Sequence, residues 1–366
     1  MKLNPGRIAT LSALLLLAVA ARAQSPEAEV AAKSSAAESA SAAPAAVTAG
    51  VVKWKAKAGG GVYSTPLVAG GAAYFGSQDY SVYAVDAETG AERWRVKTGG
   101  RVLASPALSA DGTVYFGSQD TKLYAVEAAT GRVKWKFKAL YAINSAPVVA
   151  GGLVYFTGTD GILYAVDTAT AQMRWSFSGM NGMPTSPQLA GDLLLVANAS
   201  GLYAVDAQTG QRRWSYRTPR AATGAPAVAA GVAYFGTLDG ALHAVDAKTG
   251  EPRWKFQTGA GLPHSPAVSG GAVYFGGIDG NFYAADAATG RELWRASIEN
   301  GVTSAPAVAD GTIYFGSAKG LYGLDAQTGR QRWWFETSRI VTSAPLVAPS
   351  GLIYFGGWDG TLYAVR

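Results

Sequence analysis

The chain has 366 residues, more than one ordinary globular core holds, so its length predicts two domains or an array of repeats. It contains 46 Gly, 16 Pro, 10 Trp and 18 Tyr with only 15% charged residues, a composition typical of many short strands and tight turns. The apolar fraction of 49% excludes a mainly disordered chain. The absence of Cys excludes disulfide scaffolds, thiolate zinc sites and thiol nucleophiles, and two His leave little for a histidine metal site or a catalytic triad.

The N-terminus has the pattern of a secretory signal. Lys2 and Arg7 precede an apolar run over residues 8–20, and small residues near position 23 suit cleavage. We therefore predict a signal peptide over 1–23 and export to the periplasm, with an extracellular location as the alternative. The run is too short for a membrane-spanning helix, and a lipoprotein anchor would need a Cys.

Removal of residues 1–23 takes away three basic residues and no acid, so the formal charge falls from +6 to +3. A balance this mild does not favour nucleic acid as a partner. Residues 24–50 are mostly Ala and Ser, carry no aromatic residue, and predict a flexible linker.

The remainder, residues 51–366, is periodic. Trp recurs every 39–41 residues, and Pro follows the same count. The repeated Trp residues are Trp54, Trp94, Trp135, Trp175, Trp214, Trp254, Trp294 and Trp333. Each unit contains four short runs rich in Val, Tyr, Phe and Trp, separated by Gly-containing turns, which predicts four antiparallel strands. Four strands in about 40 residues make one blade of a β-propeller.

The ends of the array predict how the ring closes. The last unit stops at Arg366 after its third strand, and the strand around Trp54 has no blade of its own. Adding the Trp54 strand to the last blade gives an all-β, eight-bladed propeller, which we expect to be monomeric, and removes an open strand edge. We expect the repeated Trp to join neighbouring blades and the repeated Asp to be structural; these Asp are Asp86, Asp167, Asp206, Asp246, Asp286 and Asp325.

The text Ala-Val-Asp-Ala-x-Thr-Gly-x-x-x-Trp, present at 84–94, 204–214 and 244–254, resembles the tryptophan-docking repeat of the propellers that bind pyrroloquinoline quinone (PQQ). This resemblance covers residues 51–366 and implies two possible branches. One comprises quinoprotein dehydrogenases, which hold PQQ and Ca²⁺ in the central funnel with a Glu, an Asn and a catalytic Asp. The other is the non-catalytic outer-membrane protein assembly factor BamB family, which is nearer in size.

The resemblance also locates the funnel wall, at the residues before each repeated Pro. Here these residues are small and hydroxylic, with Asn144 and His264 among them and no Asp or Glu. Ca²⁺ needs several oxygen ligands, commonly from carboxylates. We therefore expect no catalytic residue and no cofactor, and PQQ with Ca²⁺ is the alternative.

Residues that break the repeat lie in the loops that join one blade to the next, and these loops must emerge on one face of the ring. Met, Tyr and Arg are favoured in protein interfaces, so this face is our candidate partner-binding surface, with ordinary loop variation as the alternative. Its candidate residues are Arg101, Leu140, Tyr141, Met180, Asn181, Met183, Arg220, His264, Arg339 and Ile340.

Two features have more than one interpretation. Met173, Met180 and Met183 lie close in sequence and could bind Cu(I), but apolar packing is the favoured explanation. His264 either binds a ligand beside the funnel or is a hydrogen-bonded loop residue.

The sequence thus predicts a non-catalytic protein-binding scaffold of the cell envelope. The resemblance suggests a role in outer-membrane protein assembly, with another envelope protein or the barrel assembly machinery as partner. The alternatives are an enzyme or sensor with PQQ or another small ligand in the funnel, and a secreted adhesion module.

Overall fold

The computed structural model describes residues 48–366. The predicted signal peptide at 1–23 and the linker up to residue 47 lie outside the described residues. Within residues 48–366 the secondary structure consists of strands, and no helix there is long and apolar enough to cross a bilayer.

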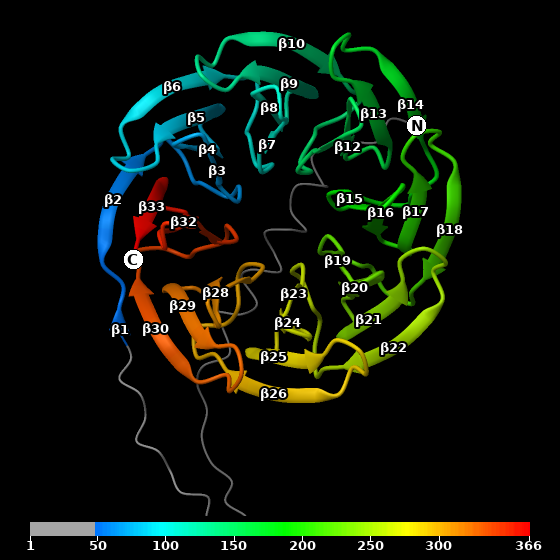
Figure 1. The fold of residues 1–366 in the computed structure, drawn as a ribbon, viewed down its shortest axis with the longest axis vertical. Coiled ribbons are helices and arrows are strands. Elements are labelled where there is room, and N and C mark those ends of the chain that lie inside the picture. Colours follow the sequence, from blue (N-terminus) through cyan, green and yellow to red (C-terminus); the bar gives the residue numbers. More distant parts are fainter. Residues whose placement is uncertain (1–47) are drawn as a thin grey trace, which may run out of the picture. The chain divides into compact units, whose positions relative to one another are not determined.

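The strands form eight sheets arranged around a central axis (Figure 1). The first four blades are, in chain order, β3 (Leu67–Ala69), β4 (Ala72–Gly76), β5 (Ser81–Asp86) and β6 (Glu92–Lys97); β7 (Ala107–Leu108), β8 (Thr113–Gly117), β9 (Lys122–Glu127) and β10 (Val133–Lys138); β11 (Val148–Ala150), β12 (Leu153–Thr157), β13 (Leu163–Asp167) and β14 (Met173–Phe177); β15 (Gln188–Ala190), β16 (Leu193–Asn198), β17 (Gly201–Asp206) and β18 (Arg212–Arg217).

The other four are β19 (Ala227–Ala229), β20 (Val232–Gly236), β21 (Ala241–Asp246) and β22 (Pro252–Gln257); β23 (Ala267–Ser269), β24 (Ala272–Gly276), β25 (Asn281–Asp286) and β26 (Glu292–Ser297); β27 (Ala307–Ala309), β28 (Thr312–Gly316), β29 (Gly320–Asp325) and β30 (Gln331–Glu336); and β31 (Leu346–Val347), β32 (Ile353–Gly356), β33 (Thr361–Val365) and β2 (Val52–Lys57). The predicted all-β, eight-bladed propeller is therefore confirmed.

Apolar packing between blades forms the core. The second and third strands of a blade are buried on both sides, while the outer strand alternates exposed and buried residues, as β6 does with Trp94 and Val96 inward. Each apolar cluster joins neighbouring blades: Tyr74 of the first blade packs in one cluster with Phe116 and Tyr124 of the second. No blade can bury its apolar faces alone, so the ring is the unit of stability.

The repeated Trp joins the blades, as predicted. The Trp54 Nε1–H donates to the carbonyl oxygen of Ala87 in the next blade at 2.9 Å, and five further Trp residues make the equivalent bond. In every blade the register shifts just before this Trp, a β-bulge that re-aims the outer strand. The glycine of each Thr-Gly turn lies under the Trp ring; a Cβ at Gly90 would lie 2.6 Å from Trp54.

The repeated Asp shapes this turn. Asp206 Oδ1 accepts hydrogen bonds from the backbone N–H groups of Gln208 and Thr209, and its Oδ2 accepts one from Arg213 at 2.7 Å. The bond from Arg213, with those from the turn, lowers the pKa of Asp206 to about 2. Since the arrangement recurs around the ring, these carboxylates are architectural, as the repetition predicts.

The ring closes through its N-terminal strand, also as predicted. β2 pairs antiparallel with β33, opposing Trp54 to Ala364, and completes the eighth blade. Residues 48–50, which the sequence analysis places in the linker, differ from that prediction: β1 (Thr48–Ala49) adds in parallel to β30 of the seventh blade, and Gly50 follows it.

Gly50 substitutes for a turn that the last blade lacks. A Cβ at Gly50 would overlap the Trp333 ring at its Cζ2 atom, so Gly50 packs on Trp333 as Gly90 packs on Trp54, against a different edge of the indole. Val51 and Arg366 then exchange two backbone hydrogen bonds of 2.7 and 2.9 Å, which tie the two ends of the propeller together. Two separate segments thereby supply the contact on Trp333 that a Thr-Gly turn supplies in other blades.

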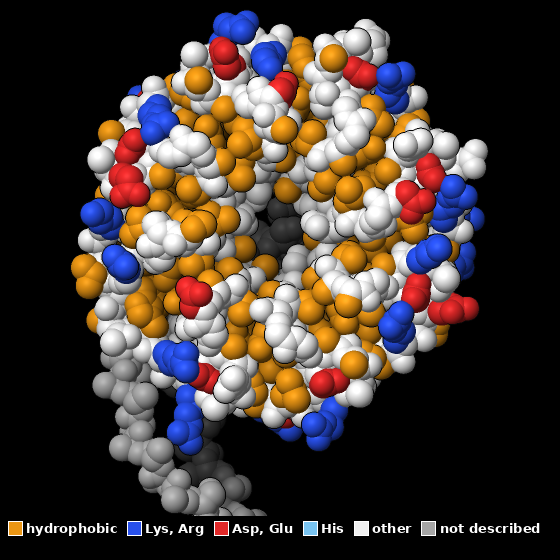
Figure 2. All heavy atoms as spheres, in the orientation of Figure 1, with side chains coloured by type: hydrophobic (Ala, Val, Ile, Leu, Met, Phe, Trp, Pro, Cys, Tyr) orange, Lys and Arg blue, Asp and Glu red, His pale blue; other side chains and the backbone are white. Residues whose placement is uncertain are grey.

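The two ends of the ring differ in the connections they carry. We call the end with the turns between the first and second strands and between the third and fourth strands the turn face. We call the other end, with the turns between the second and third strands and the blade-to-blade loops, the loop face. Figure 2 shows one face of the ring: acidic and basic side chains lie near each other along its circumference, and uncharged side chains surround the central opening.

Candidate functional site

The loop face is built from two sets of segments that hydrogen-bond to each other. The Gln119 N–H, in the turn between β8 and β9, donates to the carbonyl of Arg101 in the preceding blade-to-blade loop, at 2.9 Å. The Trp358 N–H makes the equivalent bond to Ile340 at 3.1 Å. Because this bond recurs around the ring, the loops have fixed positions.

Most of the predicted partner-binding residues are exposed on this face. Leu140 and Tyr141 are 71% and 61% exposed, and Met183 is 60% exposed. Arg101, Asn181, Arg220 and Arg339 are exposed as well, and Ile340 is half-buried. They come from loops spread around the ring, so together they mark a broad face and not one compact patch.

Met180 does not belong to that surface. Its side chain is only 5% exposed and packs in the core with Tyr155, Leu194 and Tyr203. The loop after β14 turns inward at Met180 to fill the space between the third and fourth blades. The predicted contact role of Met180 is therefore corrected: it is a packing residue.

The three methionines also lie apart. Met173 begins β14 at the turn face, whereas Met183 follows that strand at the loop face, and the strand itself is five residues long. An extended strand of that length spans roughly 16 Å, so Met173 and Met183 cannot share one metal ion. Within residues 48–366 no group of three or more His, Asp or Glu side chains is placed to hold a metal ion either.

Charges on the loop face are arranged so that the arginines are available. Arg101, Arg220 and Arg339 take part in none of the ion pairs within residues 48–366. Several acids of this face are half-buried and hydrogen-bonded, whereas Glu299 is exposed. Asp79 Oδ2 accepts hydrogen bonds from the Tyr83 hydroxyl at 2.5 Å and from the Gly59 N–H at 2.7 Å. The same Tyr–Asp bond recurs at Asp120, Asp160, Asp279 and Asp359.

Four exposed apolar residues of the loop face were missed by the sequence analysis. Tyr80, Leu238, Ile278 and Trp358 are 45%, 41%, 47% and 38% exposed, and all lie in turns between second and third strands. These turns were interpreted only as repeated Asp-Gly hairpins. The signal was present in the residue before the Asp, which changes from blade to blade; Tyr80 itself takes the place of Gly with φ of 70°.

The central funnel opens on the loop face and has a volume of about 650 Å³. Its wall contains many of the residues predicted for it, including Tyr63, Thr65, Asn144, Thr223 and Ser265. None of the residues that line it is Asp, Glu, Lys or Arg. Several hydroxyls of the inner wall are committed to the fold, since the Ser105 Oγ accepts from the Thr65 N–H of the preceding blade and Thr223 donates to the carbonyl of Leu262.

His264 replaces a buried serine. At the corresponding place in the first blade the Ser64 Oγ accepts a hydrogen bond from the Gly76 N–H at 2.8 Å. Burial lowers the pKa of His264 to about 4, partly offset by a hydrogen bond to the backbone of Val302. The imidazole is therefore neutral at physiological pH and lies in the funnel wall, apart from the exposed loop residues.

The funnel does not match the ligand needs of PQQ with Ca²⁺. Carboxylate oxygens are the usual ligands of Ca²⁺, and the wall offers only hydroxyls, amides, carbonyls and a neutral imidazole. A catalytic Asp or Glu is likewise missing from the wall.

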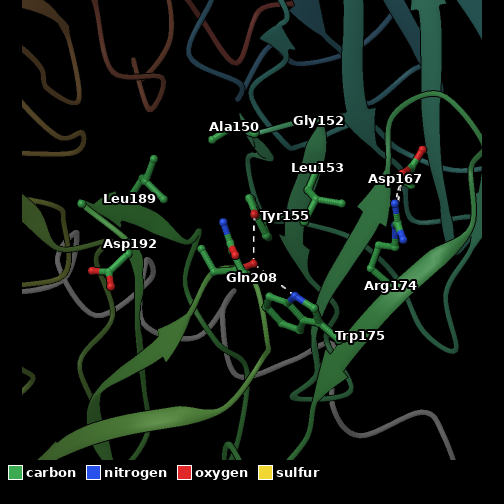
Figure 3. A pocket seen from close by; sticks show the side chains of 13 residues that line it. Ala150, Gly152, Leu153, Tyr155, Asp167, Arg174, Trp175, Leu189, Asp192 and Gln208 are labelled. Atoms are coloured by element: carbon green, nitrogen blue, oxygen red, sulfur yellow. Dashed lines mark hydrogen bonds and ion pairs between the residues drawn. The ribbon is translucent and has the colours of Figure 1, made fainter.

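A second hollow lies on the turn face between the third and fourth blades (Figure 3). Its floor is the repeated blade junction: the Tyr155 hydroxyl and the Trp175 Nε1–H both donate to the carbonyl of Ala207, at 3.0 and 3.1 Å. The ion pair of Arg174 with Asp167 at its edge is also a repeated feature. This hollow is part of the architecture.

The fold and the loop face define a class: an eight-bladed propeller with a variable, exposed loop surface. The family described as outer membrane protein assembly factor BamB matches residues 36–104, 78–238 and 238–366, so the chain belongs to this family. No protein of curated function matches the chain closely enough in sequence to count as a relative.

Solved structures share the fold at low identity. BamB from Moraxella catarrhalis is 19% identical with a TM-score of 0.75, and the match covers 87% of this chain and 99% of that one. The quinohemoprotein alcohol dehydrogenase ADHIIG from Pseudomonas putida HK5 is 18% identical with a TM-score of 0.73, covering 87% of this chain and 76% of that one. The computationally designed protein Ika8 is 19% identical with a TM-score of 0.76, covering 84% and 96%.

Proposed function

We propose that this protein is a non-catalytic scaffold of the cell envelope that holds another protein on its loop face. The observation that carries the proposal is the gathering of exposed apolar side chains and unpaired arginines on that face, Leu140, Tyr141, Met183 and Arg220 among them. Aromatic residues, Met and Arg are the residues enriched in protein interfaces.

Membership of the BamB family supports the choice of partner. We infer that the partner is an outer-membrane β-barrel or a component of the machinery that assembles barrels, and that the protein is exported to the periplasm. The uncharged funnel supports the non-catalytic part of the proposal, because a quinoprotein reaction needs a carboxylate base and Ca²⁺ ligands that the wall does not offer.

Cross-linking in the native envelope tests the proposal. The tagged protein is compared with a loop-face variant carrying Leu140→Ser, Tyr141→Ser, Met183→Ser and Arg220→Ser. A matched control carries Met173→Ser and Leu293→Ser, two residues that are also exposed but lie outside the loop face. We expect barrel-assembly proteins to be captured by the wild type and the control, and lost with the loop-face variant.

Two results would contradict the proposal. Capture that survives the loop-face substitutions would place the interface elsewhere, and capture of no outer-membrane or barrel-assembly protein would remove the proposed partner.

A further inference from the structure

An aromatic pair with no role in the repeat borders the funnel: Tyr63 lines the cavity, and Trp358 packs against Tyr63 beside it. Trp358 lies in the turn between β32 and β33, and its ring centroid is 5.4 Å from that of Tyr63, with the rings tilted by 38°. Other blades carry small, amide or aliphatic residues at the position of Trp358; these are Gln78, Gln119, Thr159, Ala199, Leu238, Ile278 and Ala318. Trp358 is therefore not required to build a blade, yet it exposes 38% of its surface.

Both rings are held in place. The Trp358 Nε1–H donates to the Thr342 Oγ1 at 3.0 Å, and Thr342 itself lines the funnel. The Tyr63 ring lies over Gly61, where a Cβ would be only 2.8 Å from its Cε2 atom. Two aromatic rings fixed in this way form a rigid platform, which loses little side-chain entropy when a ligand packs on it.

The wall next to the platform is neutral. No Asp, Glu, Lys or Arg lines the funnel, and burial keeps His264 uncharged. Burial raises the pKa of Tyr63 against the opposing effect of Arg101, which lies outside the lining. An ionic ligand inside the cavity would leave water and find no counter-charge in the lining, at a cost in free energy. An uncharged ligand does not meet that cost.

The same wall offers polar groups that the fold does not use. Within residues 48–366 the Asn144 Nδ2 group and the hydroxyls of Thr65, Thr159 and Ser265 have no hydrogen-bond partner, and all four residues line the cavity. A purely apolar ligand would displace water from these groups and leave them unpaired. The fitting ligand has an apolar face for the aromatic platform and several neutral hydroxyls.

We propose that the funnel mouth binds an uncharged saccharide, stacked on Trp358 and Tyr63 and hydrogen-bonded by Thr65, Asn144, Thr159 and Ser265. A sugar ring presents an apolar C–H face and a rim of hydroxyls, which are the two properties this site combines. A volume of about 650 Å³ lies within the range of small-ligand sites and accommodates a short oligosaccharide. Of the residues assigned to the protein partner, Met183 also lines this cavity, whereas Leu140, Tyr141 and Arg220 do not.

Calorimetric titration of the purified protein tests the site. The ligands are maltotetraose, cellotetraose and N-acetylchitotetraose, with tetragalacturonate as the charged comparator. We expect a Kd below about 1 mM for at least one neutral sugar and at least tenfold weaker binding of the charged one. Trp358→Ala and Tyr63→Ala each weaken binding by about tenfold or more, Trp358→Phe retains most of it, and Tyr80→Ala, an exposed aromatic outside the cavity, leaves it unchanged.

A second measurement identifies the source of the sugar. Co-sedimentation with purified peptidoglycan sacculi, competed by the soluble sugar that binds, indicates an envelope glycan; binding of the soluble sugar without co-sedimentation indicates a free saccharide. Either result supports the site. It is overturned if no neutral sugar binds at roughly 10 mM, if tetragalacturonate binds as tightly, or if Trp358→Ala binds like the wild type while melting at the same temperature.

Discussion

The turn face and the loop face use the same kinds of residue in opposite ways. On the turn face each repeated Asp is occupied, as Asp246 is by Arg253 at 2.8 Å, and the pKa of Asp246 falls to about 2 because of that bond and those from the turn. On the loop face five Asp residues accept a hydrogen bond from a tyrosine, and Arg101, Arg220 and Arg339 take part in no ion pair within residues 48–366. The repeated Asp of the turn face are therefore satisfied within the chain, whereas three arginines of the loop face remain available to a partner.

The difference follows from what each connection has to do. The turns of the turn face carry the Thr-Gly segment against the Trp of the neighbouring blade, so packing against that ring limits the residues they can contain. The loops of the loop face need only their backbone hydrogen bonds, which any residue supplies. Their side chains are consequently free to differ from blade to blade, and function is expected there.

The largest stability effect is expected at the closure, where the turn-face arrangement is assembled from two segments. Gly50→Val places side-chain atoms where the Trp333 ring lies, and overpacking of this kind costs about 3 kcal/mol. Denaturant unfolding measures this loss of stability. Gly70→Ala is the control, because a Cβ there meets nothing within 4 Å and only its positive φ adds a cost of about 1 kcal/mol. Equal midpoints for Gly50→Val and wild type would refute the closure role of Gly50.

The fifth blade breaks the Tyr–Asp pattern of the loop face, and His243→Tyr should restore it. His243 is buried against Tyr216 and Phe235, and its Nε2 has no partner within the described residues. A tyrosine at this position pairs with Asp239 in the way Tyr83 pairs with Asp79. We expect a gain of about 1 kcal/mol at pH 7, measured by urea unfolding.

The same substitution has a pH dependence of known sign. Burial, with a smaller contribution from Lys255 and against the opposing effect of Asp239, lowers the pKa of His243 from 6.5 to about 4. Between these values the unfolded chain binds a proton that the folded chain does not, so stability falls as pH falls, by about 1.4 kcal/mol per pH unit. The advantage of His243→Tyr should therefore grow by about 2 kcal/mol at pH 5. A pH-independent difference would contradict this assignment; His264 continues to titrate in both proteins.

A smaller gain in stability is expected in the third blade, where the turn between the third and fourth strands lacks the repeated glycine. Ala171 stands at the place of the Thr-Gly glycine and has φ of 59°. Since the left-handed region costs an L-residue roughly 1 kcal/mol, Ala171→Gly should stabilise the protein by about that amount in a thermal melt. Ala169→Gly, in the same turn without a positive φ, should lower stability slightly. If both substitutions lower it equally, backbone strain at Ala171 is not the cause.

Repetition determines what the sequence could predict. The blades, the Trp junctions, the structural Asp and the closure by the Trp54 strand follow from eight copies of one pattern. Met180 was misplaced because an irregular loop has no period that separates an inward from an outward side chain. The exposure of Trp358 and Ile278 was missed because both lie next to an Asp of the repeated pattern. The strand β1 was missed because Thr48 and Ala49 are small, exposed residues without the alternating apolar pattern of a strand.

The smallest effect on stability is expected for Leu140 and Tyr141, the loop-face residues expected to contribute most to partner binding. Leu140→Ser with Tyr141→Ser removes two side chains that are 71% and 61% exposed, so the free energy of unfolding should change by less than about 0.5 kcal/mol. Asp206→Ala on the turn face loses the bonds from Gln208, Thr209 and Arg213 and should cost about 1 kcal/mol. Cross-linking to the partner, measured below the melting temperature, should respond in the opposite way. It should be lost in the variant with Leu140→Ser and Tyr141→Ser and kept in Asp206→Ala. If the Leu140→Ser, Tyr141→Ser variant instead unfolds more easily while it still captures the partner, the assignment of stability to the turn face and of binding to the loop face is wrong.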